Sequence, residues 1–217
     1  MSYYKQQLVK QNKTVKPTLE QTAKQVASML WHHLEFHKQQ MDGWDYARDI
    51  DTSGLHKIGF NRLGAGYFSI VLEHKMVPDH VIKVTVREDE GYESWVEFAM
   101  DNQDNPLCPR VLHKEKHGEL TIYVLQKYDA IRTSNADELT QLQMAQSLFH
   151  YSLSDDYAVG GGHLLEWFAY VSRTPLEYVR SVREFLRRSK VGNMNVDLHS
   201  DNLMLHNGRI VITDPLV

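Results

Sequence analysis

The sequence contains very little cysteine: Cys108 is the single cysteine in 217 residues. One cysteine excludes an internal disulfide, and no set of cysteine and histidine residues has zinc-site spacing, so we expect a reducing compartment. The chain also lacks an apolar run long enough to cross a bilayer, and Met1–Lys16 lacks the apolar centre of a signal peptide. These absences favour a cytoplasmic protein with no membrane partner.

The charges of the chain are almost balanced. Lysine and arginine number 24, against 28 aspartate and glutamate residues, which gives a formal net charge of −4. This balance provides no general attraction to nucleic acid, so a nucleic-acid partner is not expected. With 42% hydrophobic residues, the chain can form one globular domain or two small lobes that share a cleft.

Hydrophobic periodicity divides the chain into a helical start, a β-rich middle and a helical second half. Apolar residues at helical intervals predict an amphipathic helix from Thr18 to about Gln40, and a second helix interrupts the β-rich part at Glu88–Met100. Short β-like runs predict a small sheet formed by Lys57–Leu63, Tyr67–His74, Val81–Val86 and Leu120–Gln126.

The second half of the chain predicts three more helices and a hairpin. The helices span Asp137–Leu148, His163–Val171 and Pro175 to about Ser189, and the glycines at 160–162 are interpreted as a flexible joint between the first two. The third helix has a basic face, typical of a solvated surface, with a docking surface for an acidic protein or RNA as the alternative. Asn207-Gly208, between two short apolar runs, predicts a hairpin turn.

The first motif with chemical meaning is a glycine hairpin between Leu63 and Val71. Gly64 and Gly66 have no Cβ, so the backbone N–H groups around them can approach phosphate oxygens closely. Taken alone, the motif is equally well explained as a plain glycine turn.

The second motif is a lysine inside an apolar strand, Lys83, which follows Val81-Ile82. A buried ammonium needs an anion, because an unpaired buried charge is costly; the alternative is a side chain that points to solvent. A phosphate together with a carboxylate would satisfy it. Glu93 and Glu97 lie four residues apart on one face of the predicted helix, and we favour Glu97 as the partner of Lys83.

The third and most informative motif lies near the C-terminus. Asp197 and Asn202 have the spacing D-x-x-x-x-N, and the hairpin then returns the chain to Asp214. The carboxylate of Asp214 and the side-chain carbonyl of Asn202 are hard oxygen ligands of the kind that hold Mg²⁺ beside ATP phosphates. Asp197 would orient an acceptor hydroxyl and take its proton. Turn capping or a strand end is the alternative for each residue alone.

In this order the motifs resemble those of the protein-kinase-like superfamily. More closely, four runs of the sequence are similar to the early serine/threonine protein kinase of T-seven-like bacteriophages. These runs are Gly59–Ser69, Val81–Val84, Asp197–Met204 and Ile212–Pro215. The likeness consists of scattered motifs between about residues 54 and 217.

The resemblance implies an α+β, two-lobed protein-kinase-like fold. It would comprise an N-terminal helical extension at 1–53, a small antiparallel β N-lobe at 54–130 and a reduced, mainly helical C-lobe at 131–217. Lys83 and Asp197 would be catalytic, and Asn202 and Asp214 would bind the metal. The expected contacts with the nucleotide are Gly64, Ala65, Gly66, Tyr67, Phe68, Ser69, Val71, Lys83, Glu97, Gln126 and Tyr128.

The function implied by the resemblance is an ATP-dependent serine/threonine kinase that uses Mg²⁺. Its partners would be ATP and protein substrates of the host bacterium, with the kinase itself as a further candidate substrate. It would act in the host cytoplasm, in the shutoff of host transcription. The acceptor protein, the oligomeric state and the role of the N-terminal helix stay open.

The sequence departs from the kinase pattern after Asp214. Pro215-Leu216 replaces the usual Phe-Gly, and the sequence ends at Val217 without an activation segment. The protein substrate would then be held elsewhere, or the chain would bind nucleotide without phosphorylating protein. Two alternatives therefore remain. One is a small-molecule kinase of the aminoglycoside and choline type, which also has a histidine two places after the aspartate, as at His199. The other is a pseudokinase that inhibits a host protein by binding it.

Overall fold

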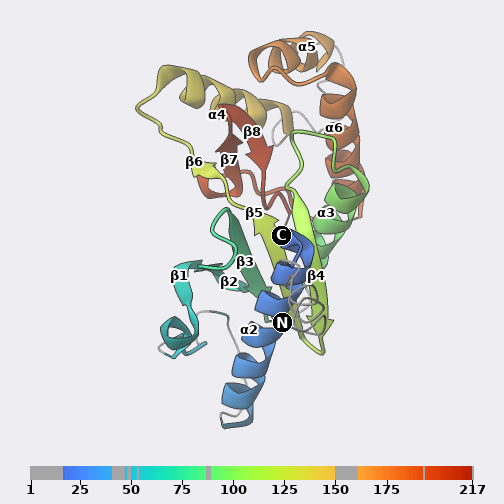
Figure 1. Ribbon diagram of the computed structural model, residues 1–217. Helices are drawn as coiled ribbons and strands as arrows, with labels where there is room; N and C mark the ends of the chain where they lie inside the picture. Colours follow the sequence, from blue (N-terminus) through green and yellow to red (C-terminus); the bar gives the residue numbers. More distant parts are fainter. Residues whose placement is uncertain are drawn as a thin grey trace, which may run out of the picture.

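The computed structural model describes residues 17–40, 47, 50–52, 54–86, 89–149, 161–192 and 194–216. These residues form an α+β structure with five α-helices and two antiparallel sheets (Figure 1). The helices are α2 (Leu19–Gln40), α3 (Glu90–Asp101), α4 (Ala136–Phe149), α5 (Gly161–Val171) and α6 (Leu176–Val191), with short 3-10 helices η2 (Leu55–Ile58) and η5 (Ser200–Asn202). Within these ranges, no helix has both the length and the apolar character that a membrane span requires.

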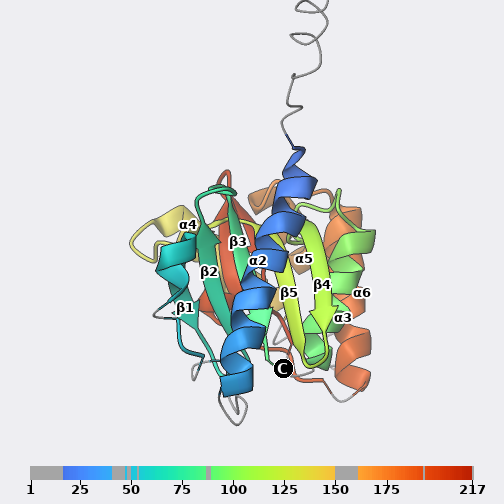
Figure 2. The same cartoon turned by 60° about the horizontal axis from the view of Figure 1, so that its bottom comes forward.

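The larger sheet has five antiparallel strands in the order β1-β2-β3-β5-β4. The strands are β1 (Phe60–Ala65), β2 (Ser69–His74), β3 (His80–Thr85), β4 (Val111–His117) and β5 (Leu120–Gln126). Alternating side chains give this sheet two different faces. On one face a buried apolar cluster, which includes Ile82 and Ile122, packs against Leu30 of α2. Figure 2 shows α2 lying across the strands.

The opposite face of the larger sheet packs against α3. Directly paired residues of antiparallel strands project to the same side, and the register pairs Lys83 with Tyr123 and Tyr123 with Lys114. The ring of Tyr123 contacts that of Tyr92 in α3 edge to face, with the centroids 5.1 Å apart. The side chain of Asp89 caps α3 by accepting a hydrogen bond from the backbone N–H of Tyr92. Lys83 therefore projects toward the start of α3.

A second core is formed by α4, α5, α6 and the smaller sheet of β6 (Asp129–Ala130), β7 (Leu203–His206) and β8 (Arg209–Ile212). α3 also takes part in it, because the buried indole N–H of Trp95 donates to the carbonyl oxygen of Ile212 at 3.2 Å. The backbone N–H of Ile212 donates to the carbonyl oxygen of Leu107 at 2.9 Å. These two bonds fix the end of β8, two residues before Asp214.

The five predicted helices are all present, with boundaries shifted by a few residues. Gly161 and Gly162 begin α5 and do not form the predicted joint, while Gly160 lies outside the described residues. The predicted turn at Asn207-Gly208 is confirmed, because both residues have positive φ angles, 52° and 74°, as a type I′ hairpin requires.

Two parts of the predicted larger sheet need correction. Lys57 belongs to η2, which is followed by Gly59 with a φ of 95°, so the strand begins only at Phe60. The sequence pattern also does not predict β4, because its residues VLHKEKH are mostly charged or histidine and lack apolar alternation. These charges are paired within the fold, since His113 contacts Glu115 and other β4 side chains contact α3.

Candidate active site

The glycine hairpin joins β1 to β2, and the backbone N–H of Gly66 donates to the carbonyl oxygen of Ser69 at 2.7 Å. Tyr67 and Phe68 form its partly exposed tip, with their rings in edge contact. A Cβ added to Gly64 would meet no atom within 4 Å, and one added to Gly66 would meet only the Ser69 oxygen, at 3.9 Å. Neither glycine has a positive φ. The fold itself therefore does not require them, whereas the close approach of a ligand backbone or phosphate would.

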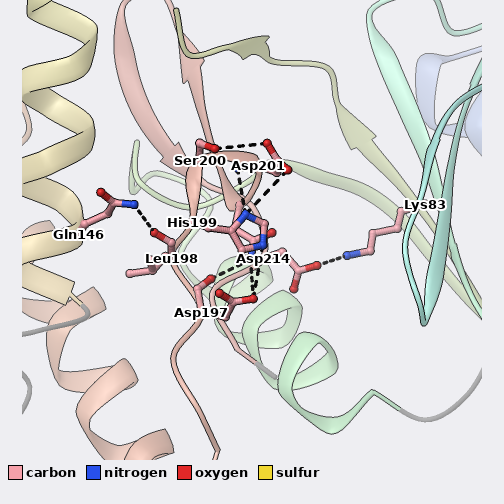
Figure 3. Close-up of polar contacts among 9 residues, drawn as sticks. Lys83, Gln146, Asp197, Leu198, His199, Ser200, Asp201 and Asp214 are labelled. Carbon is pink, nitrogen blue, oxygen red and sulfur yellow. Dashed lines mark hydrogen bonds and ion pairs between the residues drawn. The ribbon is translucent and has the colours of Figure 1, made fainter. Parts of the chain in front are cut away.

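Lys83 is only 7% exposed, and its ammonium is held from two directions. The Nζ atom donates to Oδ2 of Asp214 at 2.5 Å and lies 3.4 Å from the centroid of the Tyr92 ring. Figure 3 shows the lysine extending from its strand toward Asp214. Val71 is directly opposite Lys83 in the β2–β3 pair, so its side chain lies on the same face of the sheet.

The two loops that carry Asp197 and Asp214 run side by side. The backbone N–H of Asp197 donates to the carbonyl oxygen of Pro215 at 2.8 Å, and that of Thr213 donates to the carbonyl oxygen of Asn202 at 2.9 Å. The β7–β8 hairpin connects the two loops, because β7 begins after Asn202 and β8 ends before Thr213. The D-x-x-x-x-N segment and the second aspartate are therefore neighbours in space, as the sequence pattern predicts.

The amide of Asn202 is oriented by Asp197. Its Nδ2 donates to the backbone oxygen of Asp197 at 2.8 Å and lies 3.4 Å from Oδ2 of the same residue. This network assigns the nitrogen to the Asp197 side and leaves Oδ1 without a donor among the described residues. An amide oxygen in this position suits a hard divalent cation.

The side chain of His199 bridges the loop that contains Asp197 (Figure 3). Its Nδ1 accepts the backbone N–H of Asp201 at 3.2 Å, and its Nε2 lies 3.4 Å from Oδ2 of Asp197. Because Nδ1 accepts, the ring proton of a neutral His199 lies on Nε2, toward the carboxylate. From α4, Gln146 donates to the carbonyl oxygen of Leu198 at 2.9 Å and ties the same loop to the second core.

Burial raises the pKa of the Asp214 carboxyl above its ordinary value, although Lys83 acts in the opposite direction. The negative charges of Asp89 and Asp197 add to this increase. One lysine thus faces three nearby carboxylates, an excess of negative charge that a bound divalent cation would neutralise. In the described part of the chain no three acidic, histidine or cysteine side chains form a metal cage. Asn202 and Asp214 are the side chains here that could hold a cation, with phosphate oxygens and water as its further ligands.

The predicted pair between Lys83 and Glu97 is not formed. Lys114 of β4 takes both α3 carboxylates, with its Nζ 2.9 Å from Oε1 of Glu93 and 3.2 Å from Oε1 of Glu97. The reason is the strand that the sequence pattern does not predict: β4 places Lys114 under this part of α3, and Tyr123 separates it from Lys83. The hydrogen bond with Lys114 is the main cause that lowers the pKa of Glu93.

The side chains of Gln126 and Tyr128, predicted to contact the nucleotide, are engaged elsewhere. The hydroxyl oxygen of Tyr128 accepts the backbone N–H of Arg110 at 2.8 Å, and Nε2 of Gln126 lies 3.4 Å from the ring nitrogens of His206. Both side chains line a hollow whose walls include neither Lys83 nor the three loop residues Asp197, Asn202 and Asp214. The contact of Tyr92 with Lys83, and the ion pairs of Lys114 with Glu93 and Glu97, have no counterpart in the sequence motifs.

A glycine hairpin, a buried strand lysine and two neighbouring acidic loops together characterise phosphotransferases of the kinase class. The family model described as Bacteriophage T7 protein kinase 0.7 matches residues 7–217. The chain therefore belongs to this family of phage protein kinases, and the resemblance inferred from its motifs is confirmed. No curated protein matches the chain.

Proposed function

We propose that this chain is an ATP-dependent serine/threonine protein kinase that phosphorylates proteins of the host bacterium in the host cytoplasm. Autophosphorylation is a second reaction of the same site, and the biological role is the shutoff of host transcription. The family match supports a phage protein kinase. The site geometry supports the use of Mg²⁺ and ATP.

We also propose that the fold consists of two lobes with the active site between them. Residues 54–130 would form the N-lobe around the five-stranded sheet, residues 131–217 the C-lobe, and residues 1–53 the N-terminal extension. Two separate large hydrophobic clusters support this division: one joins α2 to the larger sheet, and the other is formed mainly by residues after 131, with Trp95, Ala99, Leu107 and Cys108 joining it from the N-lobe range. α2 packs on the face of the sheet remote from Lys83 and so would brace the N-lobe.

The contact between Lys83 and Asp214 is the observation that carries the proposal. It joins two residues that are 131 positions apart, one from the larger sheet and one from the loop after β8. A buried lysine is costly unless an anion pairs with it, and the half-buried carboxylate of Asp214 supplies that anion. Their contact lies on the face of the sheet that Lys83 shares with Val71 of β2, next to the loop of Asp197 and Asn202, and this arrangement matches the residue roles of phosphoryl transfer.

Each residue has a role that follows from its position. Lys83, in the strand next to β2, would bind the ATP phosphates, and the Oδ1 of Asn202 and the carboxylate of Asp214 would hold Mg²⁺. The bound cation would supply positive charge against the phosphates. Asp197, with a partly exposed side chain, can reach an acceptor hydroxyl and take its proton. His199 would hold the Asp197 carboxylate in place through its Nε2–H.

The test is transfer of radiolabel from γ-labelled ATP, in the presence of Mg²⁺, to the chain itself and to proteins of a bacterial lysate. Asp197→Asn and Asp214→Asn should abolish transfer. Asp201→Asn is the matched control, because this carboxylate lies in the same loop but its side chain is 89% exposed. Acid hydrolysis of the products should yield phosphoserine or phosphothreonine.

A separate measurement tests nucleotide binding without catalysis. Mg·ATP at about 100 times its dissociation constant should stabilise the protein by about 2.7 kcal/mol and raise its melting temperature. Lys83→Met should remove this increase. Transfer that persists in Asp214→Asn would refute the assignment. Phosphate transfer only to hydroxylated small molecules would identify a small-molecule kinase, and a thermal response to nucleotide without transfer would identify a pseudokinase.

A further inference from the structure

A hollow of about 670 Å³ lies where four separate segments meet. The segments are the α3–β4 loop, the end of β5 with the residues after it, the connection from α5 into α6, and the β7–β8 hairpin. The residues proposed to bind ATP phosphates and Mg²⁺ do not line it. Its volume is within the range of about 300–1,000 Å³ that is usual for ligand sites.

The hollow is lined by three arginines from three different segments: Arg110, Arg173 and Arg209. All three are exposed, and among the described residues none of their guanidinium groups has an ion pair or a hydrogen bond. Asp104 is the one carboxylate in the lining, and it already accepts a hydrogen bond from the hydroxyl of Tyr178 at 2.7 Å. The hollow therefore carries a net charge of two positive units, and a concave wall concentrates such a field.

Other polar groups in the lining add donors and no further negative charge. The hydroxyl oxygen of Tyr128 accepts the backbone N–H of Arg110, so its own O–H is left to donate. Burial raises the pKa of the Cys108 thiol to about 12, so this side chain is neutral at physiological pH. An anion entering the hollow would therefore lie among three arginines and a phenol, without a competing thiolate.

Arg173 has an unfavourable backbone conformation. It is the second residue after Val171, the last residue of α5, and has a φ of 52°, a left-handed conformation that is most often adopted by glycine at the C-terminal end of a helix. The backbone N–H of Thr174 closes this turn by donating to the carbonyl oxygen of Ala169 at 2.9 Å. The fold thus presents an arginine at a position where its backbone would favour glycine, and outliers of this kind are concentrated at functional sites.

We propose that this hollow binds a phosphorylated serine or threonine side chain of a polypeptide. A phosphomonoester carries a charge of about −1.5 to −2 at neutral pH, which matches the net charge of the lining, and guanidinium groups pair with its oxygens in bidentate geometry. The hollow has room for a phosphate and for the neighbouring peptide residues. The site does not depend on catalysis by Lys83 or Asp214.

The proposal is tested with a fluorescent peptide that contains one phosphoserine and no other acidic residue, titrated without nucleotide and followed by anisotropy. The wild-type chain should bind it at least about tenfold more tightly than the unphosphorylated peptide. Arg173→Gly and Arg209→Ala should each weaken binding by about tenfold, the effect of one charge-assisted hydrogen bond. Arg180→Ala is the control, because it removes an exposed arginine of α6 outside the hollow and should change affinity less than twofold.

Arg173→Gly separates binding from folding. Glycine suits the left-handed conformation, so the variant should melt at or above the wild-type temperature while binding the phosphopeptide more weakly. Lys83→Met should bind the peptide like wild type. Equal affinity for the two peptides, or unchanged binding by both arginine variants, would overturn the proposal. So would competition by inorganic phosphate at the same affinity as the peptide, which indicates a free-anion site, or tighter binding of a single-stranded RNA.

Discussion

Breaking the Lys83–Asp214 ion pair is expected to destabilise the protein in the absence of nucleotide, and removing both charges is expected to restore most of the loss. The lysine side chain is 9% exposed and that of the aspartate is 30% exposed. Asp214→Asn leaves the buried ammonium without an anion, a change that costs about 3–5 kcal/mol for a buried pair. Because the carboxylate is partly hydrated, we expect a loss at the lower end, about 3 kcal/mol.

The reverse substitution should cost less. Lys83→Met leaves Asp214, whose side chain is 30% exposed and whose pKa burial already raises, so the unpaired carboxyl group can stay partly hydrated or take up a proton. The double variant carries neither charge and should lie within about 1 kcal/mol of wild type, since neutral groups of similar size replace a buried pair at little cost. The sum of the stability losses of the two single variants should therefore exceed the loss of the double variant by about 2 kcal/mol or more.

Urea unfolding at pH 7, followed by tryptophan fluorescence, measures this coupling free energy. The Lys127–Glu73 pair supplies a matched control: its Nζ–Oε2 distance is 2.9 Å, but the side chains are 43% and 32% exposed. Its coupling, from Lys127→Met and Glu73→Gln, should stay below about 1 kcal/mol. If the losses of the two single variants sum to the loss of the double variant within about 0.5 kcal/mol, the charges of Lys83 and Asp214 do not interact and the proposed site geometry is wrong.

Three further predictions follow from individual residues. Gly64→Ala and Gly66→Ala should leave stability unchanged or raise it by up to about 1 kcal/mol, yet reduce the melting-temperature increase caused by Mg·ATP; unchanged nucleotide binding in both variants would contradict the phosphate role. Gly59→Ala should instead destabilise the protein, because the φ of Gly59 is 95° and a Cβ would lie 2.9 Å from His74. Cys108, whose pKa burial raises from 9.0 to about 12, should react with iodoacetamide at pH 7 about 1,000-fold more slowly in the native protein than in urea, and rapid native labelling would show that the thiol is not buried. Hydrogen bonds from Arg187 and, to a smaller extent, Arg188 lower the pKa of Glu184 from 4.5 to about 2. The stability that these ion pairs contribute is therefore present above pH 4.5 and is lost as the pH falls toward 2. Glu184→Gln should make the urea midpoint depend less on pH in that window, and an unchanged pH dependence would refute the pairing.

Local sequence rules account for much of this structure. The helices follow from apolar spacing, and the β7–β8 turn follows from Asn207-Gly208, because these two residues tolerate the positive φ angles that the turn needs. The same turn brings Asp214 back beside Asp197. The main elements of the candidate site could therefore be predicted, since short-range geometry connects the residues of the second acidic loop.

The partner of Lys83 could not be predicted in the same way. Spacing along a helix places Glu93 and Glu97 on one face, but it does not say which strand lies beneath that face. β4 supplies Lys114 there, and its sequence resembles a polar loop because charged side chains, not apolar alternation, fill the strand. Such a strand is specified by tertiary ion pairs, which a local pattern does not contain.

The packing under α3 explains why Lys83 pairs with Asp214, whereas Lys114 pairs with the α3 carboxylates. Lys83 and Lys114 lie on either side of Tyr123 in one row across the sheet. Tyr92 contacts the Lys83 ammonium with its ring and the ring of Tyr123 edge to face. For Glu93 to reach Lys83, α3 would have to turn or slide and displace the fully buried Tyr92 from this position. The α3 carboxylates therefore hold the helix on the sheet through Lys114, and Lys83 is left to the loop of Asp214, where phosphate and cation would meet.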